Sequence, residues 1–261
     1  MRRRGICTGS HGPKERIEMI RTIIVLLDVI FFLLLGVPLL LLEWIIGIFS
    51  KKAQAKSSLA IVQFAFWIVA FLSGARVTTI GEENIPKGES VLYVANHRSY
   101  FDVILCYIRV PGLTGFVAKK EMLRYPLLRD WMKLLYCSFL DRKDIKQGFA
   151  LIMQNVEYLK KGISVFVFPE GTRNKTEDIL LPFHDGSLKM AEKSGRPIIP
   201  VTINNTEQIL EAHMPRVKRA NVTIEYGKPI YMNDMSREEK KQVSGQIQEI
   251  MKETYKKNAN R

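Results

Sequence analysis

The chain has 261 residues, 47% of them hydrophobic, and its 39 Lys and Arg residues against 26 Asp and Glu residues give a formal net charge of +13. This length suits one large domain, or one domain with an appendage, and the hydrophobic content is ample for a buried core. A strongly basic surface favours anionic partners. Because no basic run is interleaved with aromatic residues, we expect membrane lipids rather than nucleic acid as the partner.

The N-terminal 75 residues divide into a basic segment, residues 1–21, and a predominantly apolar segment, residues 22–75. The apolar segment contains two uncharged runs, at 29–42 and 59–72. Each run is shorter than the roughly 20 apolar residues that a membrane-spanning helix needs. We therefore expect two helices that enter one leaflet of a membrane and anchor the protein there.

Three lysines, Lys51, Lys52 and Lys56, separate the two apolar runs. Lysine prefers the cytoplasmic side of a membrane, so a crossing by the first run alone would leave these lysines on the unfavoured side. A monotopic pair of helices avoids this cost and places the protein at the cytoplasmic face of the cell membrane. Two true spans, and the buried helical hairpin of a soluble protein, are the alternatives.

From Arg76 onward, short apolar strands alternate with helical patterns, which is typical of an α/β domain. We expect strands at 76–80, 91–95, 115–118, 163–168, 198–203 and 222–226. We expect helices at 102–108, 143–161 and 187–194, another that ends at residue 136, and a last one that begins at a capping box of Ser236 and Glu239. The prediction is a mixed sheet with helices on both faces over residues 76–261, preceded by the two-helix membrane anchor.

A polar motif, NHRSYFD at residues 96–102, follows the strand predicted at 91–95. If a helix begins near Ser99, Asp102 lies about one turn into it and its carboxylate can point back at the His97 imidazole. A carboxylate on one ring nitrogen fixes the tautomer and leaves the other nitrogen free to take a proton. The alternative is an ordinary strand-to-helix turn with a capping Asn or Ser and a hydrogen-bonded histidine.

A second polar motif, PEGTRN at residues 169–174, follows another predicted strand. Gly171 lets the backbone bend close to a ligand, and Arg173 supplies a planar fork that suits phosphate oxygens. Lys119 and Lys120, at the end of a different strand, can converge on the same anion. The alternative is that Glu170 pairs with Arg173 and only braces the loop.

Together these motifs resemble the 1-acyl-sn-glycerol-3-phosphate acyltransferase family, of bacterial type. Residues 96–102 match its NHxxxxD block, residues 168–173 its FPEGTR block, residues 117–121 with Pro126 its lysine block, and residues 196–201 its proline block. Asp141 and Arg142 match a smaller element of the family, and the two apolar runs resemble the anchor of its bacterial members. One HxxxxD is a weak signal, whereas four blocks in this order, over about residues 76–226, are a strong one.

The resemblance implies the glycerolipid acyltransferase fold and a reaction in which lysophosphatidic acid takes an acyl chain from acyl-CoA or acyl carrier protein. These thioesters are co-substrates, and no other cofactor is implied. His97 is then the general base and Asp102 its orienting partner. Direct transfer is favoured over an acyl-enzyme, because Ser99 lacks a GxSxG elbow.

The resemblance also implies that the basic residues and the second motif bind the substrate. Arg173, with Lys119, Lys120 and Arg98, is expected to hold the phosphate of the acceptor. The substrate-binding loop is expected to consist of Glu170, Gly171 and Thr172.

Other functions remain open from the sequence. Within the family, the acceptor can be another lysolipid, an ornithine-type lipid or glycerol phosphate. A thioesterase that activates water with His97 and Asp102, and a membrane-anchored lipid-binding module without turnover, are the alternatives outside it. A metal site is not expected, because the histidines His11, His97, His184 and His213 do not cluster with carboxylates. The cysteines Cys7, Cys106 and Cys137 form no CxxC pair.

Overall fold

A seven-stranded sheet is the centre of the structure, a computed structural model that describes residues 13–233 and 235–259. The strand order is β1-β7-β6-β2-β5-β3-β4. All neighbouring strands are parallel except β6 and β7, so the predicted mixed sheet is confirmed. The strands are β1 (Arg76–Ile80), β2 (Leu92–Ala95), β3 (Thr114–Lys119), β4 (Ser138–Leu140), β5 (Ser164–Val167), β6 (Ile198–Asn204) and β7 (Asn221–Tyr226).

Residues of the central strand β2 face two different cores in alternation. Tyr93 and Ala95 pack into one hydrophobic cluster, whereas Leu92 and Val94 pack into the other. Successive side chains of a strand point to opposite faces, so a strand buried on both faces is apolar at every position. This is why the sequence shows a continuous apolar run rather than an alternating pattern.

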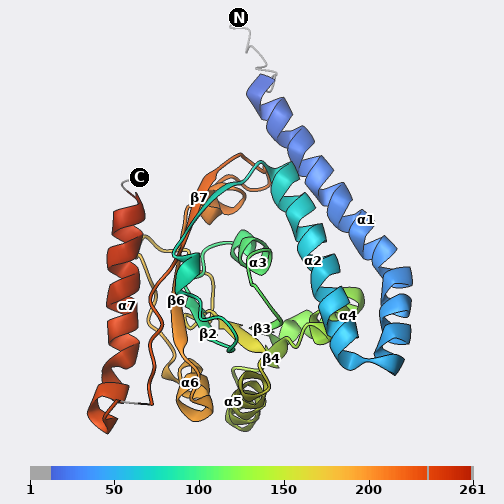
Figure 1. The fold of residues 1–261 in the computed structure, drawn as a ribbon. Coiled ribbons are helices and arrows are strands. Elements are labelled where there is room, and N and C mark those ends of the chain that lie inside the picture. The colour runs from blue at the N-terminus through green and yellow to red at the C-terminus, as the bar shows by residue number, and fades with distance from the viewer. Residues whose placement is uncertain (1–12, 234, 260–261) are drawn as a thin grey trace, which may run out of the picture.

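Helices cover both faces of the sheet, as predicted (Figure 1). The cluster around Tyr93 includes side chains from α2 (Lys51–Ser73), α3 (Tyr100–Tyr107) and α4 (Pro126–Leu134). The cluster around Leu92 includes side chains from α5 (Ile145–Lys160), α6 (Lys189–Ser194) and α7 (Arg237–Ala259). Two separate cores therefore lie on either side of one sheet.

Some element boundaries differ from the predicted ones. Helix α3 begins at Tyr100 rather than at residue 102, because Ser99 is its N-cap. The helix expected to end at residue 136 ends at Leu134, and a 3₁₀ turn, Lys120–Arg124, precedes it. Strand β4 was not predicted, since a three-residue strand carries almost no periodicity.

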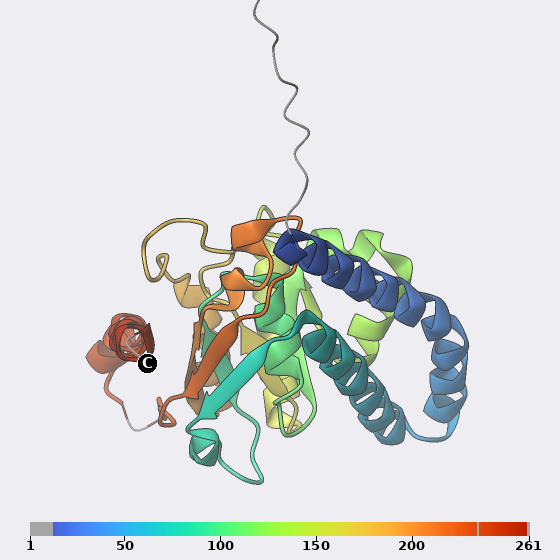
Figure 2. The same cartoon turned by 90° about the horizontal axis from the view of Figure 1, so that it is seen from above.

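The first two helices form an antiparallel hairpin beside the sheet. Helix α1 (Pro13–Phe49) continues through Pro38, and only Ser50 separates it from α2. Both helices are long and apolar enough to cross a membrane by length and composition, because each is longer than the uncharged run within it. Figure 2 shows the joint between them lying far from the sheet. Residues 1–12 of the predicted basic segment, including Cys7 and His11, lie outside the described residues.

The hairpin is held to the domain on one side and exposes apolar side chains on the other. The Gln63 side chain of α2 donates to the carbonyl groups of Tyr107 and Val110, both at 3.1 Å. Only 11% of the most apolar stretch of α1 is buried, and Leu34 and Phe49 are among its exposed residues. Such a surface is unlike the buried hairpin of a soluble protein and favours association with a membrane.

Candidate active site

The candidate site lies along one edge of the sheet, where four neighbouring parallel strands end. In the order β2, β5, β3, β4, their carboxyl ends are followed by His97, by the PEGTRN motif, by Lys120 and by Asp141. Loops at the carboxyl ends of parallel strands are the usual place for ligands in α/β sheets. The sheet therefore brings together motifs that are distant in sequence, since His97 and Glu170, which are in contact, lie 73 residues apart.

The turn after β2 is fixed by Asn96. Its side-chain amide donates to the carbonyl of Ile203, and its oxygen accepts from the N–H of Ile203, both at 2.8 Å. The next carbonyl, that of His97, accepts from the N–H of Asn174 at 2.6 Å. These contacts tie the first motif to β6 and to the second motif, so the backbone that carries His97 has little freedom to move.

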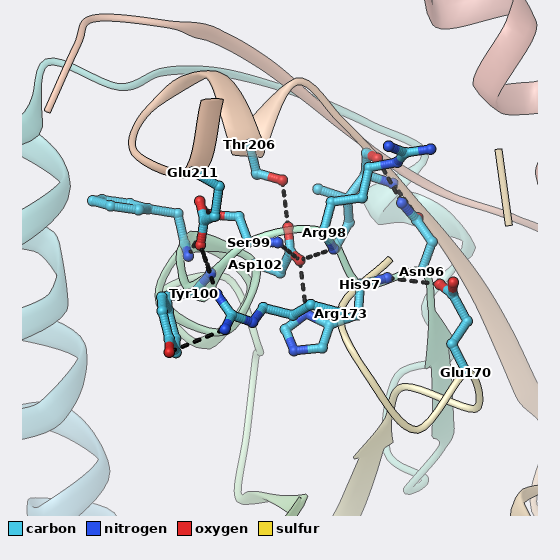
Figure 3. A network of polar contacts seen from close by, with 12 residues as sticks. Asn96, His97, Arg98, Ser99, Tyr100, Asp102, Glu170, Arg173, Thr206 and Glu211 are labelled. Atoms are coloured by element: carbon cyan, nitrogen blue, oxygen red, sulfur yellow. Dashed lines mark hydrogen bonds and ion pairs between the residues drawn. The ribbon is translucent and has the colours of Figure 1, made fainter. Parts of the chain in front are cut away.

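The His97 Nδ1 lies 2.8 Å from the Asp102 carboxylate, which is the contact that the five-residue spacing predicts (Figure 3). Asp102 is fully buried, and the same oxygen accepts from the N–H groups of Arg98 and Ser99, both at 2.7 Å. The other oxygen accepts from the Thr206 hydroxyl at 2.5 Å. Because Nδ1 is engaged, Nε2 is the ring nitrogen left to take or give a proton.

Asp102 also caps the helix that it belongs to. Ser99 and Asp102 form a reciprocal capping box at the start of α3. The contact between His97 and Asp102 and the ordinary capping turn, which the sequence offered as alternatives, therefore coexist in one structure. The His97 ring, whose side chain is 17% exposed, stacks on Phe168 with ring centroids 4.1 Å apart. The stack covers one face of the ring, and the exposed part of the side chain remains accessible.

Glu170 is a bracing residue in this structure. Its two carboxylate oxygens accept from the N–H groups of His97 and Leu181, both at 2.9 Å, and the residue is only 4% exposed. Burial raises the pKa of this carboxyl, while the two backbone N–H groups act in the opposite direction. Glu170 thus joins the two motifs, and the carboxylate that pairs with Arg173 comes from another part of the chain.

Arg173 leaves the second motif and lies against the start of α3 (Figure 3). Its guanidinium is stacked on the Tyr100 ring, 3.7 Å from the centroid, and donates to the Tyr100 hydroxyl at 3.0 Å. It also pairs with the Glu211 carboxylate at 3.2 Å. Its side chain is 22% exposed, so the guanidinium is oriented by the protein while remaining accessible.

The two lysines line a cavity of about 760 Å³ beside the ends of β3 and β4. Lys120 donates to Asp141 at 2.9 Å, and this hydrogen bond lowers the pKa of the Asp141 carboxyl. Lys119 is exposed. The other charged residues of the lining are Glu121, Arg124, Arg142 and Lys143. The cavity is therefore predominantly basic and suited to an anion.

Gly171 links this cavity to the second motif. Its φ is +67°, a conformation that favours glycine, and a side-chain carbon there would lie 3.0 Å from the His184 ring and 3.5 Å from the Arg142 guanidinium. The next residue, Thr172, is exposed. Two groups of predicted phosphate ligands are thus distinct: Arg173 lies against Tyr100 and Glu211, whereas Lys119 and Lys120 line the cavity.

Arg98 contacts the chain's own carbonyl groups. Its guanidinium donates to the carbonyl oxygens of Thr176 and Asp178 and lies over the Tyr255 ring, 5.7 Å from the centroid. Arg98 therefore holds the loop that follows the second motif against α7, and its fork is already engaged.

Two residues of the site carried no signal in the sequence. Thr206 and Glu211 follow β6, more than 100 residues after the side chains that they contact in the first motif. No local spacing connects them to it. Among the residues that the structure describes, no group of three His, Cys, Asp or Glu side chains is arranged to hold a metal ion.

The chain is similar to known acyltransferases. A profile of the family described as Acyltransferase matches residues 76–204. The 1-acyl-sn-glycerol-3-phosphate acyltransferase of Borreliella burgdorferi is 32% identical over 56% of this chain and 57% of that protein. The enzyme of the same name from Saccharomyces cerevisiae is 29% identical over 73% of this chain and 63% of its own length. These two matches span less than two thirds of each relative.

A third relative and a solved structure are covered more fully. The probable 1-acyl-sn-glycerol-3-phosphate acyltransferase of Mycoplasma pneumoniae is 31% identical over 71% of this chain and 73% of that protein. The crystal structure of the 1-acyl-sn-glycerophosphate acyltransferase from Thermotoga maritima superposes with a TM-score of 0.78 at 22% identity. It covers 94% of this chain and 98% of its own, so the two proteins share a fold that includes N-terminal helices as well as the sheet.

Proposed function

Because the chain belongs to the 1-acyl-sn-glycerol-3-phosphate acyltransferase family, as its motifs predicted, we propose that it transfers an acyl chain from a thioester to the free hydroxyl of 1-acylglycerol-3-phosphate. The product is phosphatidic acid. The observation that carries this proposal is the His97–Asp102 pair, which has a free ring nitrogen and lies beside an accessible arginine. The names of the relatives support the choice of acceptor.

His97 is the proposed general base. As the acceptor oxygen attacks the thioester carbonyl carbon, Nε2 takes the hydroxyl proton, and the buried Asp102 carboxylate stabilises the imidazolium that forms. The tetrahedral intermediate then collapses, the carbon–sulfur bond breaks, and the thiolate receives the proton from Nε2. The sequence has no GxSxG elbow, and this scheme needs no covalent acyl-enzyme.

Arg173 and the basic cavity are proposed to hold the acceptor's phosphate from its two sides. The Arg142 guanidinium, which belongs to the lining of the cavity, lies next to Gly171 in the loop that carries Arg173. Lys119 and Lys120 add point charges, whereas Arg173 adds a planar fork. Binding of the phosphate positions the acceptor's hydroxyl relative to His97, and this positioning increases the rate of the transfer. Arg98 and Glu170 act on the loops rather than on the phosphate.

The hairpin of α1 and α2 is proposed to hold the enzyme at the cytoplasmic face of the membrane without crossing it. Lys51, Lys52 and Lys56 are all exposed at the joint of the hairpin, where they suit acidic lipid headgroups. Acceptor and product are both lipids, so an active site at the interface avoids drawing acyl chains into water, at about 0.8 kcal/mol per CH₂ group.

The direct test is thiol release from acyl-CoA and from acyl carrier protein, measured with a panel of lysolipid acceptors. Release that depends on lysophosphatidic acid supports the proposal, and the thiol carrier that is consumed identifies the donor. Release without any acceptor would show a thioesterase. Saturable lipid binding without thiol release would show a lipid-binding module. Thiol release that depends on glycerol phosphate or on a different lysolipid would identify that compound as the acceptor.

A further inference from the structure

The segment that follows β6 places one carboxylate, that of Glu211, between Arg173 and the start of α3 (Figure 3). One oxygen of Glu211 accepts from the N–H of Tyr100 at 2.8 Å and from the Arg173 guanidinium at 3.2 Å. The other accepts from the Ser99 hydroxyl at 2.6 Å. Glu211 therefore contacts the arginine of one motif and the helix start of the other at the same time.

These contacts leave part of the arginine fork open. One terminal nitrogen of Arg173 contacts Glu211, the other contacts the Tyr100 hydroxyl, and the plane lies flat on the Tyr100 ring. A guanidinium has five N–H groups, so two such bonds leave others free to point at a ligand. Stacking prevents the plane from tilting, and the two bonds prevent it from rotating within that plane.

We propose that Glu211 is a positioning residue, which orients Arg173 and thereby sets the enzyme's preference for acceptors that carry a phosphate. The inference rests on the proposed function, since it assigns Arg173 to the acceptor's phosphate. An arginine that is already oriented loses less side-chain freedom when it binds, so the acceptor binds more tightly. Glu211 acts through Arg173, whereas His97 and Asp102 carry out the proton transfer.

A different role for Glu211, as a counter-ion that occupies the phosphate site, predicts the opposite effect on acceptor binding. If Glu211 occupied the place of the phosphate as a counter-ion, the acceptor would have to displace it, and removing its charge would strengthen acceptor binding. Loss of the Glu211 charge should therefore raise KM for the acceptor if Glu211 positions Arg173, and lower it if Glu211 is a counter-ion. A third possibility is that Glu211 only supports the start of α3, in which case its loss would affect every acceptor equally.

The test compares Glu211→Gln with the wild-type protein on two soluble short-chain acceptors, lysophosphatidic acid and the matching monoacylglycerol without phosphate. Glutamine keeps the size of the side chain and can still bond Ser99 and Tyr100, but it removes the charge that faces Arg173. We expect KM for lysophosphatidic acid to rise about tenfold, with kcat changed less than about twofold. Transfer to monoacylglycerol should not change.

Two further variants sharpen the result. In an Arg173→Ala background, Glu211→Gln should have no additional effect on KM, because the group that it positions is absent. Glu207→Gln is the matched control, since Glu207 lies on the same segment, in the turn Thr206–Gln208, and its Oε2 has no hydrogen-bond partner among the residues that the structure describes. Its kinetics should equal those of the wild type.

A fall in KM, no change in KM, or an equal loss with both acceptors would overturn the proposal. If the wild-type protein releases no thiol with lysophosphatidic acid, it is the proposed function that fails. Glu211 is then judged by calorimetric titration with short-chain lysophosphatidic acid, in which Glu211→Gln should bind about tenfold more weakly than the wild type. Equal or tighter binding in the variant would reject the positioning role independently of turnover.

Discussion

At the scale of single residues, Asp102 differs from His97 because it belongs both to the helix cap and to the His97–Asp102 pair. Asp102 caps α3 and orients His97, so substitutions at these positions are expected to share a catalytic defect but to differ in stability. His97→Ala should lower transfer about 10²–10⁴-fold, the range that general-base catalysis supplies, with little change in thermal stability. Asp102→Asn should lose nearly as much activity and also about 1 kcal/mol of stability through the weakened cap.

Thiol release and thermal unfolding, measured on the same preparations, check this pair of variants. Near-normal turnover in either one would remove His97 as the proposed base. Equal stability of the two variants would show that the capping box contributes little.

The shape of the Arg173 side chain should matter more than its charge. Arg173→Lys keeps the positive charge but loses the planar fork that stacks on Tyr100 and reaches Glu211. We expect KM for the acceptor to rise about tenfold or more with a smaller change in kcat, because most of the phosphate's binding energy is present before the reaction begins. Steady-state kinetics measure this, with Arg129→Lys in α4 as the control. Unchanged acceptor kinetics would mean that Arg173 only braces its loop.

Glu170 gives the site a predictable dependence on pH. Burial raises its pKa in the folded protein above the ordinary value of 4.5, so the folded state binds the proton more tightly than the unfolded chain. The contribution of this carboxyl to stability is therefore fully present below pH 4.5 and is lost as the pH rises through the folded pKa.

Glu170→Gln keeps the size of the side chain and cannot ionise, which makes it the reference for this effect. We expect the wild-type protein to lose stability relative to the variant as the pH is raised from about 4 towards 7. Urea unfolding of both proteins at a series of pH values measures the difference. A constant difference would show that the two backbone N–H bonds cancel the effect of burial, and a difference that moves in the other direction would show that they outweigh it.

At the scale of elements, the segment between β6 and β7 connects the N-terminal hairpin with the candidate active site. Arg216 pairs with Glu15 at 2.7 Å, and the N–H of Val217 donates to the Thr22 hydroxyl at 2.8 Å, so the segment is held to the start of α1. The same segment carries Thr206 and Glu211. A short stretch of chain therefore touches both α1 and the start of α3.

Arg216→Ala tests how firmly this segment holds α1. The ion pair is partly exposed, so global stability should fall by less than about 1 kcal/mol. Local opening should increase, and amide hydrogen exchange over residues 15–22 should become faster while exchange in β2 stays the same. Arg129→Ala, which removes another partly exposed ion pair, is the control. Unchanged exchange in α1 would mean that the apolar contacts of the hairpin alone hold the helix.

At the scale of the whole molecule, charge is expected to work together with the apolar hairpin. The net charge of +13 favours acidic membranes, and Lys51, Lys52 and Lys56 are exposed on the hairpin itself. Replacing these three with alanine should weaken binding to acidic vesicles by up to about 3 kcal/mol, at about 1 kcal/mol per lysine, and less in high salt.

A matched control replaces three exposed lysines on the other side of the sheet, Lys160, Lys161 and Lys241, and should leave vesicle binding nearly unchanged. Vesicle sedimentation at several salt concentrations measures both triple variants. Equal losses would show that total charge, rather than the position of the hairpin, determines binding. Cysteine labelling at residues 51–56 in intact cells then tests the topology, since labelling from outside would establish a true span.

The sequence by itself determined those features that depend on near neighbours. The apolar runs predicted the strands buried on both faces, and the five residues from His97 to Asp102 were enough to place a carboxylate against an imidazole. Both follow from local geometry, because a strand alternates its faces and a helical turn brings nearby residues together. The order of four motifs was likewise sufficient to predict the family.

Only the tertiary structure decided which distant groups meet. Arg173 pairs with Glu211 rather than with Glu170, three residues away, because the fold turns Glu170 into a buried contact between two loops and leaves its oxygens bonded to backbone N–H groups. Likewise, α1 continues through Glu43, the charged residue that ends its uncharged run, and one oxygen of this buried carboxylate accepts from the Ser57 hydroxyl of the neighbouring helix. A buried polar group is tolerated only with a partner, and no local pattern says which residue will supply it.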